Sequence, residues 1–154
     1  YAALGWAISQ WAVVELWMKY IYSRTTGGSG TAQASAQVSF DVVINFNTRL
    51  NMVDWAIQTR FPNNTDILTR WNALKNRATK RAGARNELAH FSVMQTNPPL
   101  PDGSTIFAIT DHWPSIVKHN GDPPKLVRTQ IVSKGESFAK LANDLLSFYD
   151  SLPH

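Results

Sequence analysis

Apolar residues recur every three or four positions along several long segments of the chain, which is the pattern of buried or amphipathic helices. The first segment covers residues 2–23, and five of its apolar residues follow this spacing: Leu4, Ile8, Trp11, Met18 and Tyr22. Other apolar residues cover its remaining sides, so this helix must be enclosed by its own fold or by a second subunit. Glu15 and Lys19 lie within it, and because charges at mid-span are costly in lipid we expect no membrane span.

The same spacing predicts two further helices in the first two thirds of the chain. TTGGSG, at 25–30, is expected to be a flexible loop, and a second helix is expected over about 35–61, where a proline ends it. A third helix is expected to begin at an N-cap on Asn64 or Thr65 and to run to about Met94.

The next segment has a different composition. Six prolines between 98 and 124 exclude long helices there. The runs at 104–110 and 125–133 are rich in β-branched and apolar residues, so we expect two short strands, paired as a hairpin or arm. A final amphipathic helix is expected to start near Ser133 or Gly135.

The pattern as a whole predicts one domain, residues 1–154, that is mainly all-α. We expect an up-and-down bundle of about four helices with a short β-hairpin or arm before the last. The absence of cysteine excludes disulfides, thiolate zinc sites and a cysteine nucleophile, and fits a cytoplasmic location. The sequence begins with Tyr1 instead of methionine, which suggests that the natural N-terminus is absent or processed.

Charge adds an expectation about partners. The net charge is +4 with a pI near 9.6, which favours an anionic partner. Six basic residues, and no acidic one, lie from Arg70 to Arg85. This run is either a solvated helix face or a phosphate-binding face. The expected RNA-binding residues are Arg70, Lys75, Arg77, Lys80 and Arg81.

The basic run ends in RNELAH, residues 85–90. Helical residues advance about 100° each, so Asn86 and His90 fall about 100° and 140° from Arg85 and border one side of the helix. Asn86 precedes His90 by four residues, so its amide can orient the imidazole. Alanines floor this side and would let a second copy of the helix approach closely: Ala78, Ala82 and Ala89.

This helix-borne R-N-x-x-x-H, late in a helical bundle, resembles the signature of the HEPN superfamily (higher eukaryotes and prokaryotes nucleotide-binding domains). The resemblance implies a metal-independent endoribonuclease without a cofactor that acts as a homodimer. Arg85 would clamp the phosphate, His90 would act as general base or acid, and Asn86 would position His90 or a phosphate oxygen. Such an enzyme is expected to serve as a toxin or as a stress or phage-defence effector, with an antitoxin or another regulatory protein as partner. The strand-like segment 104–133 departs from a minimal HEPN bundle.

Two other interpretations of the motif are open. The chain is either a HEPN-like module without catalysis, which binds RNA, a nucleotide or a protein partner, or a structural helical protein in which RNELAH is incidental. A metal site is a weaker alternative, and its candidate ligands are Asp111, His112 and His119. Glu15 is expected to be buried and to pair with Lys19, or to reach the third helix and hold Arg85 or another basic residue there.

Overall fold

The computed structural model describes residues 2–90, 92–95, 107–110 and 128–153; the side chains of His90 and of both strands lie outside this description. The described chain is mainly helical and forms a bundle, as the apolar pattern predicts. In chain order the elements are α1 (Ala2–Gly27), α2 (Gly30–Asp41), α3 (Phe46–Arg60), α4 (Thr65–His90), β1 (Ser92–Gln95), β2 (Phe107–Thr110) and α6 (Arg128–Ser151).

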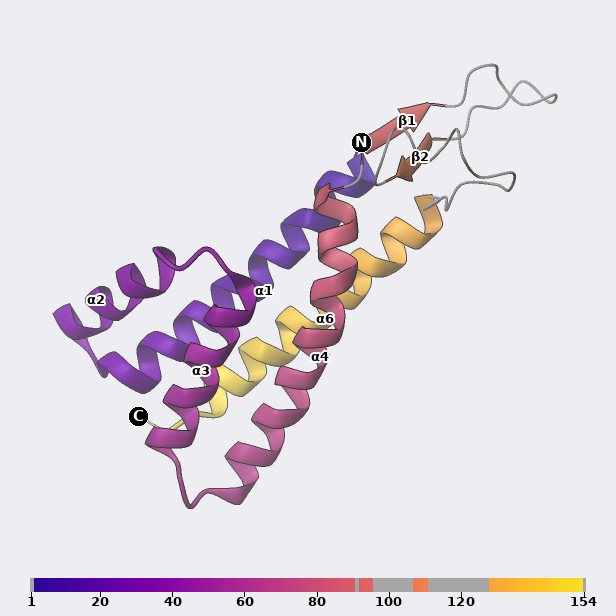
Figure 1. The fold of residues 1–154 in the computed structure, drawn as a ribbon. Coiled ribbons are helices and arrows are strands. Elements are labelled where there is room, and N and C mark those ends of the chain that lie inside the picture. The colour runs from indigo at the N-terminus through magenta and orange to yellow at the C-terminus, as the bar shows by residue number, and fades with distance from the viewer. Residues whose placement is uncertain (1, 91, 96–106, 111–127, 154) are drawn as a thin grey trace.

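The first and last helices lie side by side and run in the same direction (Figure 1). At one end of the pair, Gly135 of α6 contacts Trp6 and Ala7 of α1 so closely that a Cβ at position 135 would lie 2.3 Å from Cζ3 of Trp6. At the other end, the guanidinium of Arg24 donates to the backbone carbonyls of Tyr149 and Leu152. Helices α3 and α4 complete the bundle, and the shorter α2 packs on α1 (Figure 1).

Buried residues of α1 follow alternating steps of four and three, and aromatic rings join the long helices. Trp11 of α1 packs edge-on against Phe138 of α6, with ring centroids 5.2 Å apart, and Trp71 of α4 lies 5.9 Å from Phe148. The buried face of α1 consists of Ala7, Trp11, Val14, Met18 and Ile21. The monomer's own helices therefore enclose most of α1, and its apolar character no longer argues for a second subunit.

The expected second helix over 35–61 is wrong, because two helices occupy that range. Helix α2 ends at Asp41 and α3 begins at Phe46. Three consecutive β-branched residues, 42–44, have low helix propensity at this point. Asn45 then caps α3, since its side chain accepts a hydrogen bond of 3.0 Å from the backbone N–H of Thr48.

The loop expected at 25–30 is also shorter than the composition indicates. Helix α1 continues to Gly27 and α2 begins at Gly30, so only Gly28 and Ser29 separate them. Gly28 and Gly30 have positive φ angles of 64° and 65°, which glycine adopts without strain. The turn between the helices therefore depends on backbone geometry and not on a long flexible segment.

The N-terminus of α4 confirms the expected cap, because the backbone N–H of Ile67 donates to the side chain of Asn64 over 3.1 Å. The helix ends at His90, short of the expected Met94, and β1 follows it. β1 pairs antiparallel with β2, with Val93 opposite Ile109. The hairpin predicted between 104–110 and 125–133 is wrong, because residues from Arg128 onward are helical.

The error at 128–133 has a physical reason. The β-branched residues of this stretch indicate a strand, but Ile131 also begins a helical series of buried residues that continues through Gly135 and Phe138. Burial of that series against α1 overrides local β propensity. The last helix consequently begins about five residues before the position that its amphipathic pattern suggests.

Candidate functional site

Arg85 and Asn86 meet on α4, one turn before the helix ends. Nη1 of Arg85 donates to Oδ1 of Asn86 over 3.2 Å. Arg85 is half-buried and Asn86 is exposed. Arg85 follows the buried Ala78 by seven residues and precedes the buried Leu88 by three, so it lies on the stripe of α4 that faces the core. The cation of Arg85 therefore lies beside buried apolar residues of α4.

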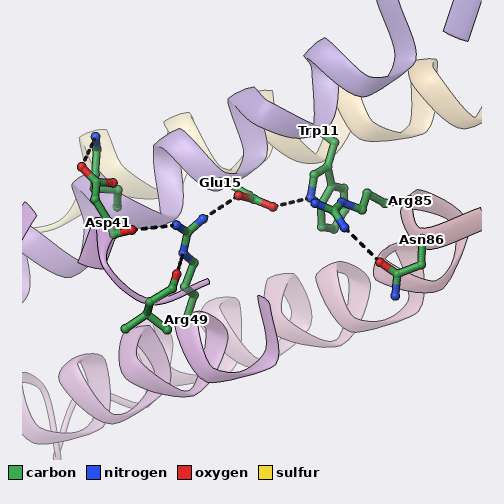
Figure 2. A network of polar contacts seen from close by, with 8 residues as sticks. Trp11, Glu15, Asp41, Arg49, Arg85 and Asn86 are labelled. Carbon is green, nitrogen blue, oxygen red and sulfur yellow. Dashed lines mark hydrogen bonds and ion pairs between the residues drawn. The ribbon is translucent and has the colours of Figure 1, made fainter. Parts of the chain in front are cut away.

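A cavity of about 520 Å³ opens beside this arginine. Three parts of the chain line it. Helix α1 contributes Trp11 and Glu15. Residues 44–47 come from the α2–α3 connection and the first turn of α3. Helix α4 contributes polar and small residues between 79 and 86 that include Arg85 and Asn86. Figure 2 shows Arg85 extending from α4 toward α1, on the same side as Trp11 and Glu15. The cavity is therefore a place where a ligand would meet both helices.

Both expected partners of Glu15 are wrong. Oε2 of Glu15 accepts a hydrogen bond of 2.7 Å from Nη1 of Arg49 on α3, and Oε1 accepts one of 2.7 Å from Nε1 of Trp11 (Figure 2). Lys19 instead pairs with Asp41 at 3.2 Å. The sequence pattern predicts one continuous helix over 35–61, and such a helix would not bring Arg49 to α1. The pattern therefore did not indicate this pair.

The Arg49–Glu15 pair changes the electrostatics of the cavity. Arg49 neutralises the carboxylate that lines the cavity together with Arg85. Within the described residues Arg85 has no carboxylate partner, and its only hydrogen bond goes to Asn86. Because a guanidinium has five N–H donors, most of its capacity remains for an anion.

The basic run of α4 largely faces the neighbouring helices. Arg77 pairs with Asp144 of α6, and Nε of Arg81 donates to the carbonyl oxygen of Ser137 over 3.1 Å. Further along, Lys134 pairs with Glu87 at 2.6 Å. These contacts follow an antiparallel register between α4 and α6. Burial, together with the neighbouring charge of Arg77, lowers the pKa of Arg81, while Asp144 acts in the opposite direction.

Two of the three remaining cations of the run are also bound to other parts of the fold, and Lys80 is the exception. Arg70 donates to Oγ of Ser151 over 2.9 Å, lies over the ring of Phe148 and is 3.5 Å from Asp66. Lys75 pairs with Asp54 of α3 at 2.6 Å. Lys80 is exposed and, in the described ranges, makes no ion pair. RNA binding by this run remains a prediction, but four of its five cations already serve the fold.

Asp54 is the centre of a polar cluster between α3 and α4. Nε1 of Trp71 donates to its Oδ1 over 2.8 Å, and Lys75 and Gln58 also contact the carboxylate. Burial acts to raise the pKa of Asp54, but these hydrogen bonds and the Lys75 charge outweigh it and lower the pKa below its ordinary value of 3.8. The cluster stabilises the bundle and is separate from the cavity.

The alanine floor expected between two copies of α4 is wrong for one of its members. Ala78 is only 1% exposed, because it packs inside the monomer's own core. Ala82 is half-buried and lines the cavity, whereas Ala89 is exposed. Ala78 therefore cannot contact a second copy of α4, whereas Ala89 can. The homodimer remains a prediction.

Two candidate groups fall partly or wholly outside the described residues. His90 is the last residue of α4, but its side chain is outside the description, as are Asp111, His112 and His119. Among the residues that the structure does describe, no three histidine, aspartate or glutamate side chains gather closely enough to hold a metal ion.

Sequence reasoning missed the residues at the start of α3 that complete the cavity. Ile44 and Asn47 line it, and Arg49 controls the charge of Glu15. The available signal was the N-x-x-T spacing of Asn45 and Thr48, which marks a helix start.

Comparison with protein-family models, with curated proteins and with solved structures finds no match to this chain. Within the described ranges, no helix combines the length and the apolar character needed to cross a membrane.

Proposed function

We propose that the chain is a metal-independent endoribonuclease of the HEPN type that acts as a homodimer. The observation that carries the proposal is Arg85, which lines a cavity, is bonded to Asn86 and has no carboxylate partner in the described part of the chain. His90 follows Asn86 by one helical turn. An arginine fork and a histidine together supply what cleavage of RNA requires, namely charge stabilisation and proton transfer.

The chemistry uses the 2′-hydroxyl of RNA as the nucleophile. His90 removes its proton, or protonates the leaving 5′-oxygen, while Arg85 stabilises the negative charge on phosphorus. One motif supplies one histidine, so a second subunit would supply the other proton carrier. The products are a 2′,3′-cyclic phosphate and a 5′-hydroxyl, and no step needs a metal. The proposed setting is cytoplasmic, as a toxin or as a stress or phage-defence effector with an antitoxin or other regulatory partner.

A second candidate is a HEPN-like module that binds RNA or a nucleotide without cutting it. It is favoured by the intramolecular bonds of Arg70, Lys75, Arg77 and Arg81, which leave fewer cations for a long RNA. Under this alternative the cavity at Arg85 would bind a single phosphate-bearing group.

Incubation of the purified chain with end-labelled RNA in excess EDTA tests the proposal. The expected result is cleavage that resists the chelator and gives 2′,3′-cyclic phosphate ends. RNA that binds but stays intact over a wide range of protein concentration would instead support the binding module. Light scattering at tens of micromolar protein tests the homodimer in the same preparation.

A further inference from the structure

The connection before α3 contributes to the cavity lining an apolar side chain that packs little against the rest of the fold. Ile44 is 93% exposed although it lines the cavity, so it contributes little to the core. Its neighbour Phe46 is half-buried and lines the cavity too, and its ring lies 4.9 Å from that of Trp11. An exposed apolar side chain beside a fixed aromatic ring offers a surface on which a planar group can rest.

Amide groups around the same cavity have free hydrogen-bonding capacity. The side chain of Asn47 makes no hydrogen bond to any described residue, and Nδ2 of Asn86 is free in the same sense, because only Oδ1 of that residue is bonded. Asn45, in contrast, uses its oxygen to cap α3. A free amide presents a donor and an acceptor side by side, which is the arrangement that pairs with the edge of a nucleobase.

Charge and volume restrict the ligand further. Arg49 neutralises Glu15, so the cation of Arg85 is the uncompensated charge among the described residues that line the cavity. The volume of about 520 Å³ is in the range of about 300–1,000 Å³ that small-molecule sites occupy. A ligand with one phosphate, a planar ring and an edge of donors and acceptors matches all three properties.

We propose that the cavity is a nucleobase subsite, in which Asn47 contacts the edge of the base, Ile44 contacts its face, and Arg85 holds the adjacent phosphate. The role of Arg85 rests on the proposed function. Unstacked bases of single-stranded RNA are recognised in this manner, through stacking and contacts to their edges. Asn47 and Ile44 are therefore specificity residues and take no part in proton transfer.

Binding of small probes to the full chain tests the subsite apart from cleavage. Titration calorimetry with 5′-AMP, 5′-UMP and ribose 5-phosphate compares ligands that share a 5′-phosphate but differ in the base or lack one. We expect at least one nucleotide to bind about tenfold more tightly than ribose 5-phosphate. Asn47→Ala and Ile44→Ser should each remove most of this advantage without changing the affinity for ribose 5-phosphate.

Matched controls are available on the same elements. Asn51→Ala changes an exposed asparagine one turn along α3, and Val42→Ser changes an exposed apolar residue two positions before Ile44; neither residue lines the cavity. Equal affinity of the wild-type chain for all three probes would overturn the subsite, as would equal losses in Asn47→Ala and Asn51→Ala. A chain that prefers nucleotides but never cuts RNA would keep the subsite and lose the ribonuclease proposal. Cleavage without any preference for nucleotides would do the reverse.

Discussion

Nη1 of Arg49 lies 2.7 Å from Oε2 of Glu15, so a residue of α3 neutralises a carboxylate of α1 beside the cavity that Arg85 lines. The pair is largely shielded from water, with side chains 17% and 22% exposed. Arg49 also donates to the backbone carbonyls of Asp41 and Val43, which places its guanidinium against the α2–α3 connection. One side chain thus connects the fold of that turn with the charge of the cavity.

Arg49→Met should weaken binding of ribose 5-phosphate, because the released carboxylate of Glu15 would repel the phosphate and attract Arg85. Unfolding should also require about 1.5–3 kcal/mol less, since hydrogen bonds to charged groups contribute that amount. Adding Glu15→Gln should restore much of both properties. Calorimetry and urea unfolding of the two single variants and the double variant measure this coupling, and strictly additive effects would contradict it.

His90→Ala should reduce the rate of RNA cleavage by about 10²–10⁴-fold, the usual contribution of a general acid or base, while RNA binding persists. Arg85→Lys should also lose most activity, because an ammonium cannot present two parallel donors to a phosphate. Asn86→Ala should cost less than either change. Single-turnover cleavage in EDTA gives the rates, with circular dichroism as the folding control. Cleavage at the wild-type rate by His90→Ala would refute the mechanism.

Lys80 and Arg81 should respond differently to loss of charge, although they are neighbours. Lys80→Gln should leave stability unchanged and reduce the slope of log affinity for RNA against log salt by about one. Arg81→Gln should lower the free energy of unfolding by about 1 kcal/mol, because its donor to the carbonyl of Ser137 is lost. Filter binding over a salt series and urea unfolding separate the two effects. An unchanged slope for Lys80→Gln would show that this residue only solvates the helix.

The lowered pKa of Asp54 predicts that the folded chain loses stability in acid. Its pKa is lowered in the folded chain, so the folded state favours the ionised carboxylate. The resulting stabilisation is complete above the unfolded value of about 3.8 and is lost as pH falls below it toward the folded pKa. Urea unfolding between pH 2.5 and pH 6 should therefore show a steeper decline for wild type than for Asp54→Asn. Asp66→Asn, at a carboxylate 77% exposed, is the control and should decline as wild type does.

Two glycine substitutions should change the free energy of unfolding in opposite directions. Gly135→Ala would place a methyl group 2.3 Å from Trp6 and 3.1 Å from Cα of Ala7, so we expect a destabilisation of about 1–3 kcal/mol. Gly5→Ala lies in α1 with no atom within 4 Å of the new methyl group, and should stabilise the chain by about 0.5–1 kcal/mol. Thermal unfolding of both variants measures the difference. Stabilisation by Gly135→Ala would contradict the close packing of α1 on α6.

Much of the bundle could be predicted because a helix that buries one face needs apolar residues at regular spacing, and this spacing is visible in the sequence. The repeat in α1 and the Asn64 cap of α4 are local signals of this kind. The break at 42–45 was missed because apolar β-branched residues preserve a hydrophobic pattern while they disfavour a helix. The helical start of α6 was missed for the opposite reason, since its burial against α1 depends on residues more than a hundred positions away.

In the candidate site, too, local contacts could be predicted from the sequence, whereas contacts between distant residues could not. Arg85 and Asn86 are neighbours in sequence, so their contact follows from local geometry. The partner of Glu15 depends on where α3 begins, which the pattern did not indicate. The basic run was assigned from charge alone, and a sequence does not show that Asp144 and Ser137 lie opposite Arg77 and Arg81.

The pairing of the first helix with the last also has a consequence for synthesis of the chain. Residues 28–127 separate α1 from α6, and a ribosome needs about 5–20 s to add that many residues. Throughout this interval Ala7 and the rest of the α1 face that packs against α6 have no helix to bury them. The nascent chain therefore carries exposed apolar surface until α6 leaves the exit tunnel, and it should bind cellular chaperones until then.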